Sequence, residues 1–321
     1  AVAFLAKAAM WPLNFWLVPA YASASAPSAA IFALLTKVGI YVLLRLSTLL
    51  FSPEAGDSAG FGSQWLAWGG MATLAFGAIG MLASQDGGRM AGYGAIISSG
   101  TLLAVIGHSG SAVLASGLYY LLGSTLAMAA FMLLIELTER IRPPGAALIA
   151  ITMEAFAIED KPEEPVGVGI PGSLAFLGLS FAACALVISG MPPLAGFVAK
   201  FSLFHAMLAS AADANGGVPM RTWVLIALRV TGGLAAIIAL MRLGVRTFWA
   251  AGVVTPPRLQ VSEALPVTAL VLLCVLLTVQ AGTVFDYLGR TVDGLARNAD
   301  YAARVLGEPP VLRAPAAEGA R

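Results

Sequence analysis

The chain has 321 residues, of which 59% are hydrophobic and 11% charged, and its mean hydropathy is +0.87. Soluble domains carry about 25% charged residues, so the composition excludes an ordinary soluble protein, and a formal net charge of +1 gives no case for a nucleic-acid partner. The apolar runs are continuous and about twenty residues long, the length of a membrane-spanning helix, whereas a barrel needs alternating runs. We therefore predict an all-α polytopic membrane protein.

About eight membrane segments can be drawn along the chain with a window of about twenty residues. The first is interrupted at Trp11-Pro12 and again at Val18-Pro19, and the sixth is broken between 190 and 200. Because the apolar pattern is already running at Ala1, we expect a chain without a signal peptide that lacks part of its N-terminus. The predicted segments are approximately 1–20, 28–51, 62–83, 90–107, 110–138, 172–210, 221–241 and 262–284.

The break in the sixth segment predicts a site. Pro192 and Pro193 remove two backbone donors, and the freed carbonyls need partners that lipid does not offer, so the break must face the interior of the bundle. Lys200 follows the break, whereas Lys7 precedes the break of the first segment. Two inverted copies of one broken helix would give this mirrored order, and such repeats place ion sites near the bilayer midplane.

Three of the four lysines in the chain, Lys7, Lys37 and Lys200, lie inside apolar runs. A charged lysine at the bilayer centre costs about 2.5–3.5 kcal/mol on insertion scales, so each needs a reason. Burial also disfavours the charged form, which allows a lysine to load and release a proton near neutral pH. The structural alternatives are an interfacial Lys7, and ion pairs for Lys37 and Lys200. Among the acidic residues only Glu136 falls clearly within an apolar segment, so we expect a wet cavity or counter-charges from outside this chain.

Other ionisable residues carry weaker signals. His205 lies five residues beyond Lys200, but a lone histidine is more often interfacial or hydrogen-bonded than a relay member. Glu136 and Glu139 fit the end of a helix beside Arg140 and Arg142 better than a proton site. We expect Arg229, inside the seventh segment, to pair with a carboxylate from elsewhere. The two cysteines, Cys184 and Cys274, are expected to be small core residues.

The sequence contains none of the motifs of a nucleotide, haem, iron–sulfur or zinc site, so we expect neither cofactor nor metal. Energy for transport would then come from a gradient or from a partner. The longest polar connection, 143–171, is expected to be a solvated loop with an amphipathic piece at 146–158. Lysine and arginine concentrate in this loop and in the loops on the same side, which predicts that this side is cytoplasmic and that the tail after Gly289 lies outside.

Three stretches resemble one family, the D subunits of Mrp (also called Mnh or Pha) multisubunit cation/proton antiporters, which are similar to the antiporter-like subunits of respiratory complex I. The first, from Lys7 to Tyr21, is similar to the family's lysine followed by Pro-Leu-x-Phe-Trp-Leu-Pro. The stretch from Leu34 to Arg45 is similar to its next helix, and the one from Gly190 to Phe201 to its Gly-Leu-Pro-Pro-Leu-x-Gly-Phe-x-x-Lys-Phe break. The resemblance continues into the tail, at Ala299-Asp300-Tyr301 and Val305-Leu306-Gly307.

The resemblance implies an antiporter-like bundle of inverted repeats with broken helices. Residues 1–51 would end the first repeat, 52–250 would form the second around the break at 190–200, and 251–321 would hold the last membrane helix and the tail. It also implies that the family's preceding helices, including the one with its key glutamate, lie outside this chain. Lys7, Lys37 and Lys200 would be the proton-relay lysines.

Two departures from the family pattern matter. Many relatives carry a protonatable pair after two tyrosines, whereas here Tyr119-Tyr120 is followed by Ser124 and Met128. The neighbouring hydroxyls of Ser124 and Thr125 would then hold water in the centre of the relay. In addition, Asn14 stands where complex I relatives often have histidine, which favours the Mrp interpretation.

The sequence therefore predicts a proton-conducting subunit of a multisubunit Na⁺(K⁺)/H⁺ antiporter in a bacterial inner membrane, a secondary transporter component rather than an enzyme. Its partners would be other antiporter subunits, lipid, protons and Na⁺ or K⁺. The alternative is a proton-pumping membrane-arm subunit of a respiratory NADH:quinone oxidoreductase, and a third hypothesis is an inactive scaffold subunit. Glu136, His205, Asn14, Ser124 and Thr125 are secondary site candidates.

Overall fold

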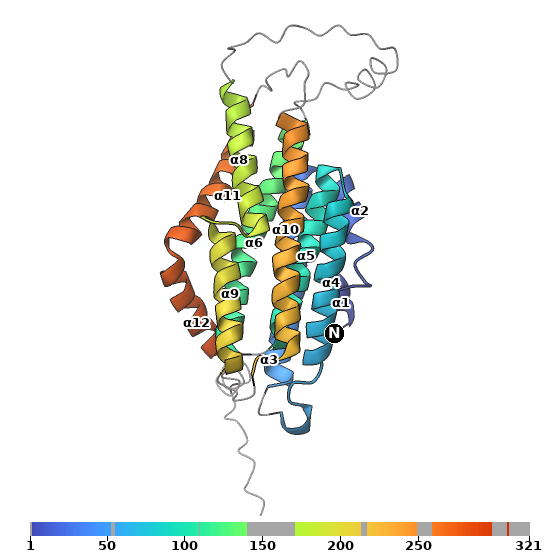
Figure 1. The fold of residues 1–321 in the computed structure, drawn as a ribbon, viewed down its shortest axis with the longest axis vertical. Helices are drawn as coiled ribbons and strands as arrows, with labels where there is room; N and C mark the ends of the chain where they lie inside the picture. The colour runs from blue at the N-terminus through green and yellow to red at the C-terminus, as the bar shows by residue number, and fades with distance from the viewer. Residues whose placement is uncertain are drawn as a thin grey trace, which may run out of the picture.

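The computed structural model describes residues 2–52, 55–108, 110–139, 171–212, 217–248 and 259–296, together with Gly307. Helices make up its regular elements (Figure 1), and seven of them are long and apolar enough to cross a membrane, while α9 is a shorter apolar helix. The elements are α1 Val2–Lys7, α2 Leu17–Ser23, α3 Ala26–Leu50, the short 3₁₀ helix η1 Gly56–Ser58, α4 Ser63–Ala83, α5 Gly87–His108, α6 Ser111–Glu139, α8 Gly172–Ser189, α9 Ala195–Ala212, α10 Met220–Phe248, α11 Val261–Val279 and α12 Ala281–Ala296.

The predicted all-α membrane bundle with broken helices is confirmed, but two boundaries are wrong. Val18-Pro19 does not interrupt the first segment, because Pro19 lies in the first turn of α2, where the backbone N–H that proline lacks would have no helical partner. The last segment ends at Val279, and a further helix, α12, occupies part of the predicted tail. The predicted surface piece at 146–158 lies outside the described residues.

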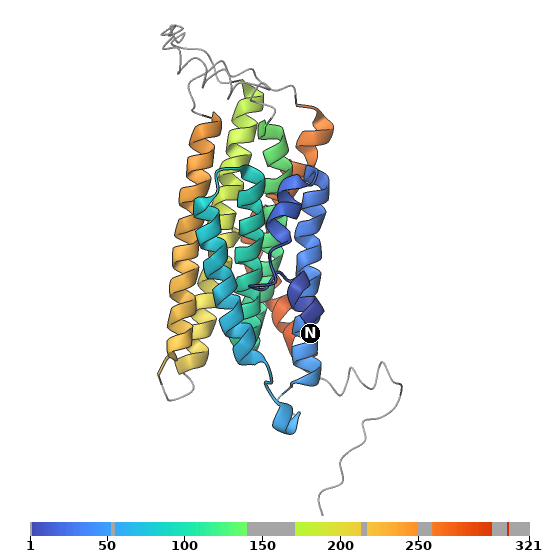
Figure 2. The ribbon, with the colours of Figure 1, turned by 90° about the vertical axis from the view of Figure 1, so that its right-hand side faces the viewer.

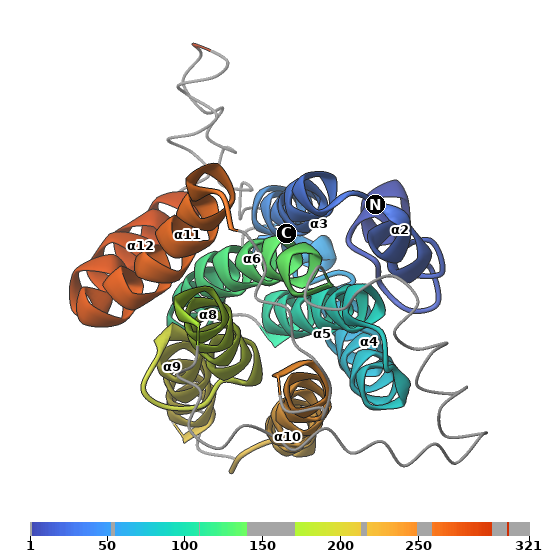
Figure 3. The same cartoon turned by 90° about the horizontal axis from the view of Figure 1, so that it is seen from above.

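The helices run roughly side by side along the long axis of the bundle (Figure 2), and α6 lies at its centre (Figure 3). Around α6 pack α3, α5, α8, α9, α11 and α12. The most enclosed helix is α5, because 94% of its apolar window is buried inside the protein. Polar residues on α5 and α6 are therefore removed from lipid, and each must be satisfied by a neighbouring helix.

Glycines explain why α4 and α5 approach so closely. A Cβ atom on Gly70 would lie 2.4 Å from the backbone nitrogen of Ala104, and one on Gly100 would lie 2.5 Å from that of Leu74. Side chains larger than hydrogen would separate the two helices. The glycine-rich composition of these segments is thus a packing device, as small residues at helix contacts in membranes usually are.

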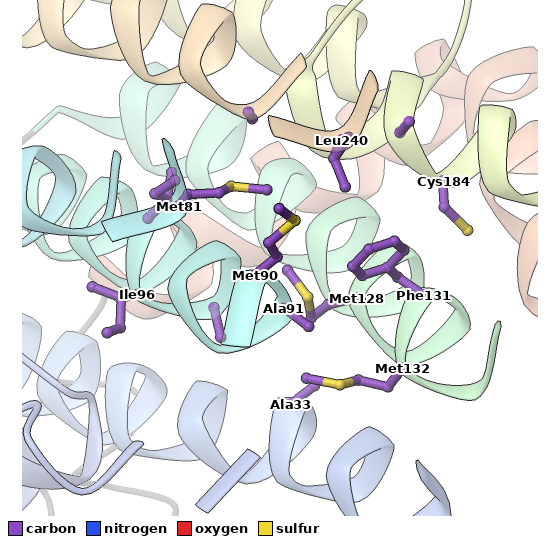
Figure 4. Close-up of a cluster of buried hydrophobic side chains, with 14 of the residues drawn as sticks. Ala33, Met81, Met90, Ala91, Ile96, Met128, Phe131, Met132, Cys184 and Leu240 are labelled. Atoms are coloured by element: carbon purple, nitrogen blue, oxygen red, sulfur yellow. The ribbon is translucent and has the colours of Figure 1, made fainter. Parts of the chain in front are cut away.

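A cluster of buried methionine, aromatic and aliphatic side chains joins α4, α5, α6, α8 and α10. Met81, Met90 and Met128 point toward one another, with Phe131 and Leu240 beside them (Figure 4). Flexible thioether side chains fill irregular gaps between helices well. The cluster fixes α5, α6 and α10 relative to one another, and these helices carry the polar residues of the site.

Candidate functional site

The chain contains two interrupted helices, and the second lies beside the candidate site. The chain leaves helical geometry between α1 and α2 and again between α8 and α9, and each interruption contains a cis proline bond, at Trp11–Pro12 and Pro192–Pro193. Gly190 ends α8 with a φ of +70°, in the left-handed region that glycine adopts without strain. The second interruption therefore turns the chain sharply and leaves backbone carbonyls of α8 available to other groups.

One such carbonyl binds the ammonium group of Lys200. The Nζ atom donates a hydrogen bond of 2.9 Å to the backbone oxygen of Ser189, the last residue of α8. The ammonium group fits because its neighbours lack side chains: a Cβ on Gly190 would lie 3.0 Å from Nζ, and one on Gly233 of α10 only 2.6 Å. Lys200 is half-buried in this slot between the break and α10.

Lys37, in the middle of α3, is 6% exposed and starts a chain of side-chain hydrogen bonds. Its Nζ atom donates to the hydroxyl of Ser98 on α5 at 2.5 Å, and the Ser98 hydroxyl donates to that of Ser124 on α6 at 3.0 Å. The Ser124 hydroxyl donates in turn to the carbonyl of Leu121 on its own helix. This hydroxyl chain, Lys37–Ser98–Ser124, crosses three helices.

A small cavity lies at the far end of the hydroxyl chain. Its volume of about 10 Å³ is room for about one water molecule. Polar groups meet there from three helices, because Ser98 of α5, Ser124 and Tyr120 of α6 and Arg229 of α10 all line it. Gly233 lines it too, so the cavity lies between the hydroxyl chain and the slot of Lys200.

Arg229 is the fixed charge of the site. It is 2% exposed, and its guanidinium group lies over the ring of Tyr120, 4.6 Å from the ring centroid. Within the described ranges no carboxylate forms an ion pair with Arg229, Lys37 or Lys200, so the partner expected for Arg229 is replaced by an aromatic face. A cation held on a ring keeps its charge, whereas an ion pair would neutralise it.

The other residues singled out from the sequence lie away from this cavity. Lys7 is exposed at the end of α1, and His205 is exposed on α9 with its ring stacked on Phe201. Glu136 is half-buried near the end of α6, and Thr125 is buried with its hydroxyl bonded to Leu121 of its own helix.

Asn14 lies in the first interruption, at the floor of an open groove of about 360 Å³ that Arg89 also lines. Its side chain is 4% exposed, and its Nδ2 atom has no hydrogen-bond partner. The groove is lined from α2, α4 and α5, whereas the cavity is lined from α5, α6, α8 and α10, and the two share no lining residue. Asn14 therefore belongs to the first interruption and not to the path between Lys37 and Lys200.

Sequence reasoning missed Ser98 altogether. A serine in an apolar helix usually bonds back to its own backbone or lets helices approach, so its residue type carries no specific signal. The available clue was that Lys37 needed a buried acceptor and that few acids were present to supply one.

The groups of the site are ones that can bind and release protons. Each hydroxyl can accept a proton on one side and donate one on the other, and an amine can store one. Within the described part of the chain, no three histidine, cysteine or acidic side chains gather where a metal ion could bind.

Comparison with known proteins gives a consistent result. Residues 1–149 match the family model described as NADH:quinone oxidoreductase/Mrp antiporter, TM. Over 311 residues the chain is 50% identical to the D subunit of a probable K(+)/H(+) antiporter from Rhizobium meliloti, covering 96% of this chain and 58% of that protein. It is 28% identical to the D subunit of a Na(+)/H(+) antiporter from Bacillus subtilis, covering 94% and 56%. The chain thus spans less than two thirds of these relatives.

Solved structures show the same fold. A chain of the Mrp complex from Dietzia sp. superimposes with a TM-score of 0.74 at 21% identity, covering 95% of this chain and 60% of that one. A chain of respiratory complex I from Thermus thermophilus gives a TM-score of 0.62 at 21% identity, covering 89% and 57%. At these identities the likeness concerns the fold alone.

Proposed function

Residues 1–149 belong to the NADH:quinone oxidoreductase/Mrp antiporter membrane family, and from this premise we propose that the chain is the proton-conducting part of the D subunit in a multisubunit Na⁺(K⁺)/H⁺ antiporter. The observation that carries the proposal is the hydroxyl chain Lys37–Ser98–Ser124, which leads to a cavity bordered by Gly233, the residue against which Lys200 lies. An amine, two hydroxyls and a water-sized space that leads toward a second amine would form a path for protons.

The mechanism follows from the properties of the groups. Lys37 loads a proton and passes one to the Ser98 hydroxyl, which releases its own to Ser124. Ser124 would release its own proton to a water molecule in the cavity, which would pass one of its protons on toward Lys200. The break beside Lys200 provides a backbone carbonyl that stabilises its charged form, and the apolar surroundings favour release. Lys7 would extend the path from the end of α1, at the start of the interruption that also holds Asn14.

The repeat boundaries proposed from the sequence suit this path. Residues 1–51 would end one repeat with α1 to α3, residues 52–250 would form the next with α4 to α10, and residues 251–321 would follow. The path would then cross the boundary between the repeats, because Lys37 belongs to α3 and Ser98 to α5.

The relatives are subunits of larger assemblies, and we infer that this chain also works in a hetero-oligomeric complex in a bacterial inner membrane. Its partners would be further antiporter subunits, and it would be a transporter component rather than an enzyme. The relatives that match over nearly the whole chain are named for K(+)/H(+) and Na(+)/H(+) antiport, which favours antiport over a role in a respiratory oxidoreductase.

Exchange in membrane vesicles tests the proposal. The complete complex is expressed in a host without its own antiporters, and membrane vesicles are prepared from it. The internal pH of these vesicles should change when K⁺ or Na⁺ is added on one side of the membrane. The chain expressed by itself should give no such response, because in the described ranges neither Lys37 nor Lys200 has a carboxylate to balance its charge. Affinity purification should recover small antiporter subunits. Recovery of flavin or iron–sulfur subunits instead would show that the respiratory alternative is right.

The orientation of the bundle gives a second test. Arg242 and Arg246 of α10 bind the turn between α4 and α5 through Leu82, Ser84 and Gln85, at the end where α8 begins (Figure 1). The concentration of arginine at this end predicts that it faces the cytoplasm.

Gln85→Cys should therefore resist an impermeant thiol reagent added to intact cells, whereas Ser58→Cys at the opposite end should be labelled. The two native cysteines are buried and should contribute little background. Labelling of Gln85→Cys from outside, with protection of Ser58→Cys, would show that the bundle is inverted.

A further inference from the structure

Arg229 carries a buried charge that the proposed relay of lysines does not use. An arginine in the middle of a membrane bundle is costly, and such residues normally have a charged partner. Arg229 is 2% exposed, its Nε atom has no hydrogen-bond partner, and within the described ranges no carboxylate pairs with it. Its charge is therefore retained without neutralisation at a buried position of α10, where a leucine or methionine would pack at lower cost.

The position of Arg229 relates it to Lys200. Both Arg229 and Gly233 line the cavity from one face of α10, since residues four apart on a helix are neighbours. Lys200 lies against Gly233, close enough that a Cβ there would approach its Nζ atom to 2.6 Å. Arg229 therefore lies one turn of α10 away from the residue against which the Lys200 ammonium group packs. Two positive charges beside one small cavity repel each other strongly because little water screens them.

Tyr120 explains how the arginine charge is held in place. Its ring lies beneath the guanidinium group at 4.6 Å, and Tyr120 is itself buried on the central helix α6. A ring attracts a cation through its quadrupole and leaves the net charge unchanged. The ring thus fixes the position of a full positive charge, which an aspartate or glutamate in the same place would cancel.

We propose that Arg229 is a positioning residue of the proton path, a permanent charge held on Tyr120 that drives the proton from Lys200 after it has been loaded. The inference rests on the proposed function. Arginine cannot carry the proton itself because guanidinium does not deprotonate at working pH. Its constant charge instead makes the protonated form of Lys200 less favourable than it would be beside a neutral residue, so the lysine releases its proton during turnover.

Ionisable groups lie on each of the helices packed around α9, in addition to His205 of α9 itself. Those on the packed elements are Tyr119, Tyr120, Glu136 and Glu139 of α6, Cys184 of α8, Arg221, Arg229, Arg242 and Arg246 of α10, and Glu263 and Cys274 of α11. Of these, Tyr120 and Arg229 line the cavity. The acidic residues lie near the helix ends, away from the break.

The test compares Arg229→Met with the parental protein in vesicles that contain the complete complex. Methionine fills similar space without charge, and replacing a buried charge by an apolar residue is often neutral for stability. Without the arginine charge Lys200 should keep its proton to higher pH, so the pH of half-maximal exchange should move toward alkaline values by ~1 unit. Thr231→Ala is the control on the same helix, because the exposed Thr231 hydroxyl bonds to the carbonyls of Ala227 and Leu228 of α10, and it should have the parental pH profile.

Three further results decide the inference. If Arg229→Met fails to assemble on native gels, Arg229→Gln is measured in its place with the same expected shift. An assembled neutral variant with the parental pH profile would overturn the role of Arg229, while loss of exchange in Lys200→Arg would show that the relay itself stands. Undiminished exchange in Lys200→Arg would overturn both proposals together.

Discussion

Lys200→Arg is expected to lower the rate of cation-dependent proton exchange by at least ~100-fold, the scale of a lost proton-transfer group. Guanidinium stays charged at working pH, so the variant could hold a proton at the break but could not release it. Lys200→Met should fail to the same extent for the opposite reason, since a thioether accepts no proton. Methionine also fits the slot beside Gly190 and Gly233, which is tight around the lysine.

The measurement is exchange in vesicles from a host without its own antiporters, with assembly of the complete complex checked on native gels. Ser202→Ala is a matched control on the same helix, because the Ser202 hydroxyl bonds only to the carbonyl of Ala199 in α9. That control should exchange at the parental rate. If either Lys200 variant assembles and exchanges at the parental rate, Lys200 is a structural cation and its place in the relay is wrong.

Ser98→Ala should reduce exchange by ~10–100-fold, because it removes the acceptor of the Lys37 ammonium and interrupts the hydroxyl chain at its middle member. A hydrogen bond to a charged group contributes about 1.5–3 kcal/mol, which corresponds to that range of rates. The substitution deletes a single oxygen atom from an enclosed helix, so the packing of α5 against α4 and α6 should be little affected.

Ser99, the residue after Ser98, provides a closely matched control. Ser99 is fully buried on the same helix, and its hydroxyl has no hydrogen-bond partner. Ser99→Ala therefore deletes the same atom at the same depth without touching the path, and it should exchange at the parental rate. Equal losses in Ser98→Ala and Ser99→Ala would mean that the effect comes from packing. Parental exchange in Ser98→Ala would exclude the hydroxyl chain as the route.

Features that depend on a residue type rarely found in apolar runs could be predicted from the sequence. A proline pair in an apolar run identified the break between α8 and α9, and lysines in apolar runs identified Lys37 and Lys200 as buried or half-buried. The same reasoning singled out Lys7, with an interfacial position as the alternative, and its side chain is exposed at the end of α1. Hydropathy predicts that a residue lies in a span, but not toward which side of that span it points.

The connections between these residues could not be predicted, because they depend on contacts between distant segments. Lys37 and Ser98 are 61 positions apart, and a serine in a membrane helix has several commoner uses. Tyr120 and Arg229 meet only because α6 and α10 both face the cavity. The helix α12 was missed for another reason: its exposed Asp286, Tyr287 and Arg290 make it too polar for a search based on continuous apolar runs.

The direction of the hydrogen bonds along the hydroxyl chain has a kinetic consequence. Lys37 donates to Ser98 and Ser98 to Ser124, but Ser124 donates back to the carbonyl of Leu121 on its own helix and not into the cavity. Its O–H bond must swing away from that carbonyl before a proton can leave, and afterwards both hydroxyls point the opposite way and must rotate back. On the proposed path the two hydroxyls would therefore pass one proton and would then have to reorient before they could pass the next.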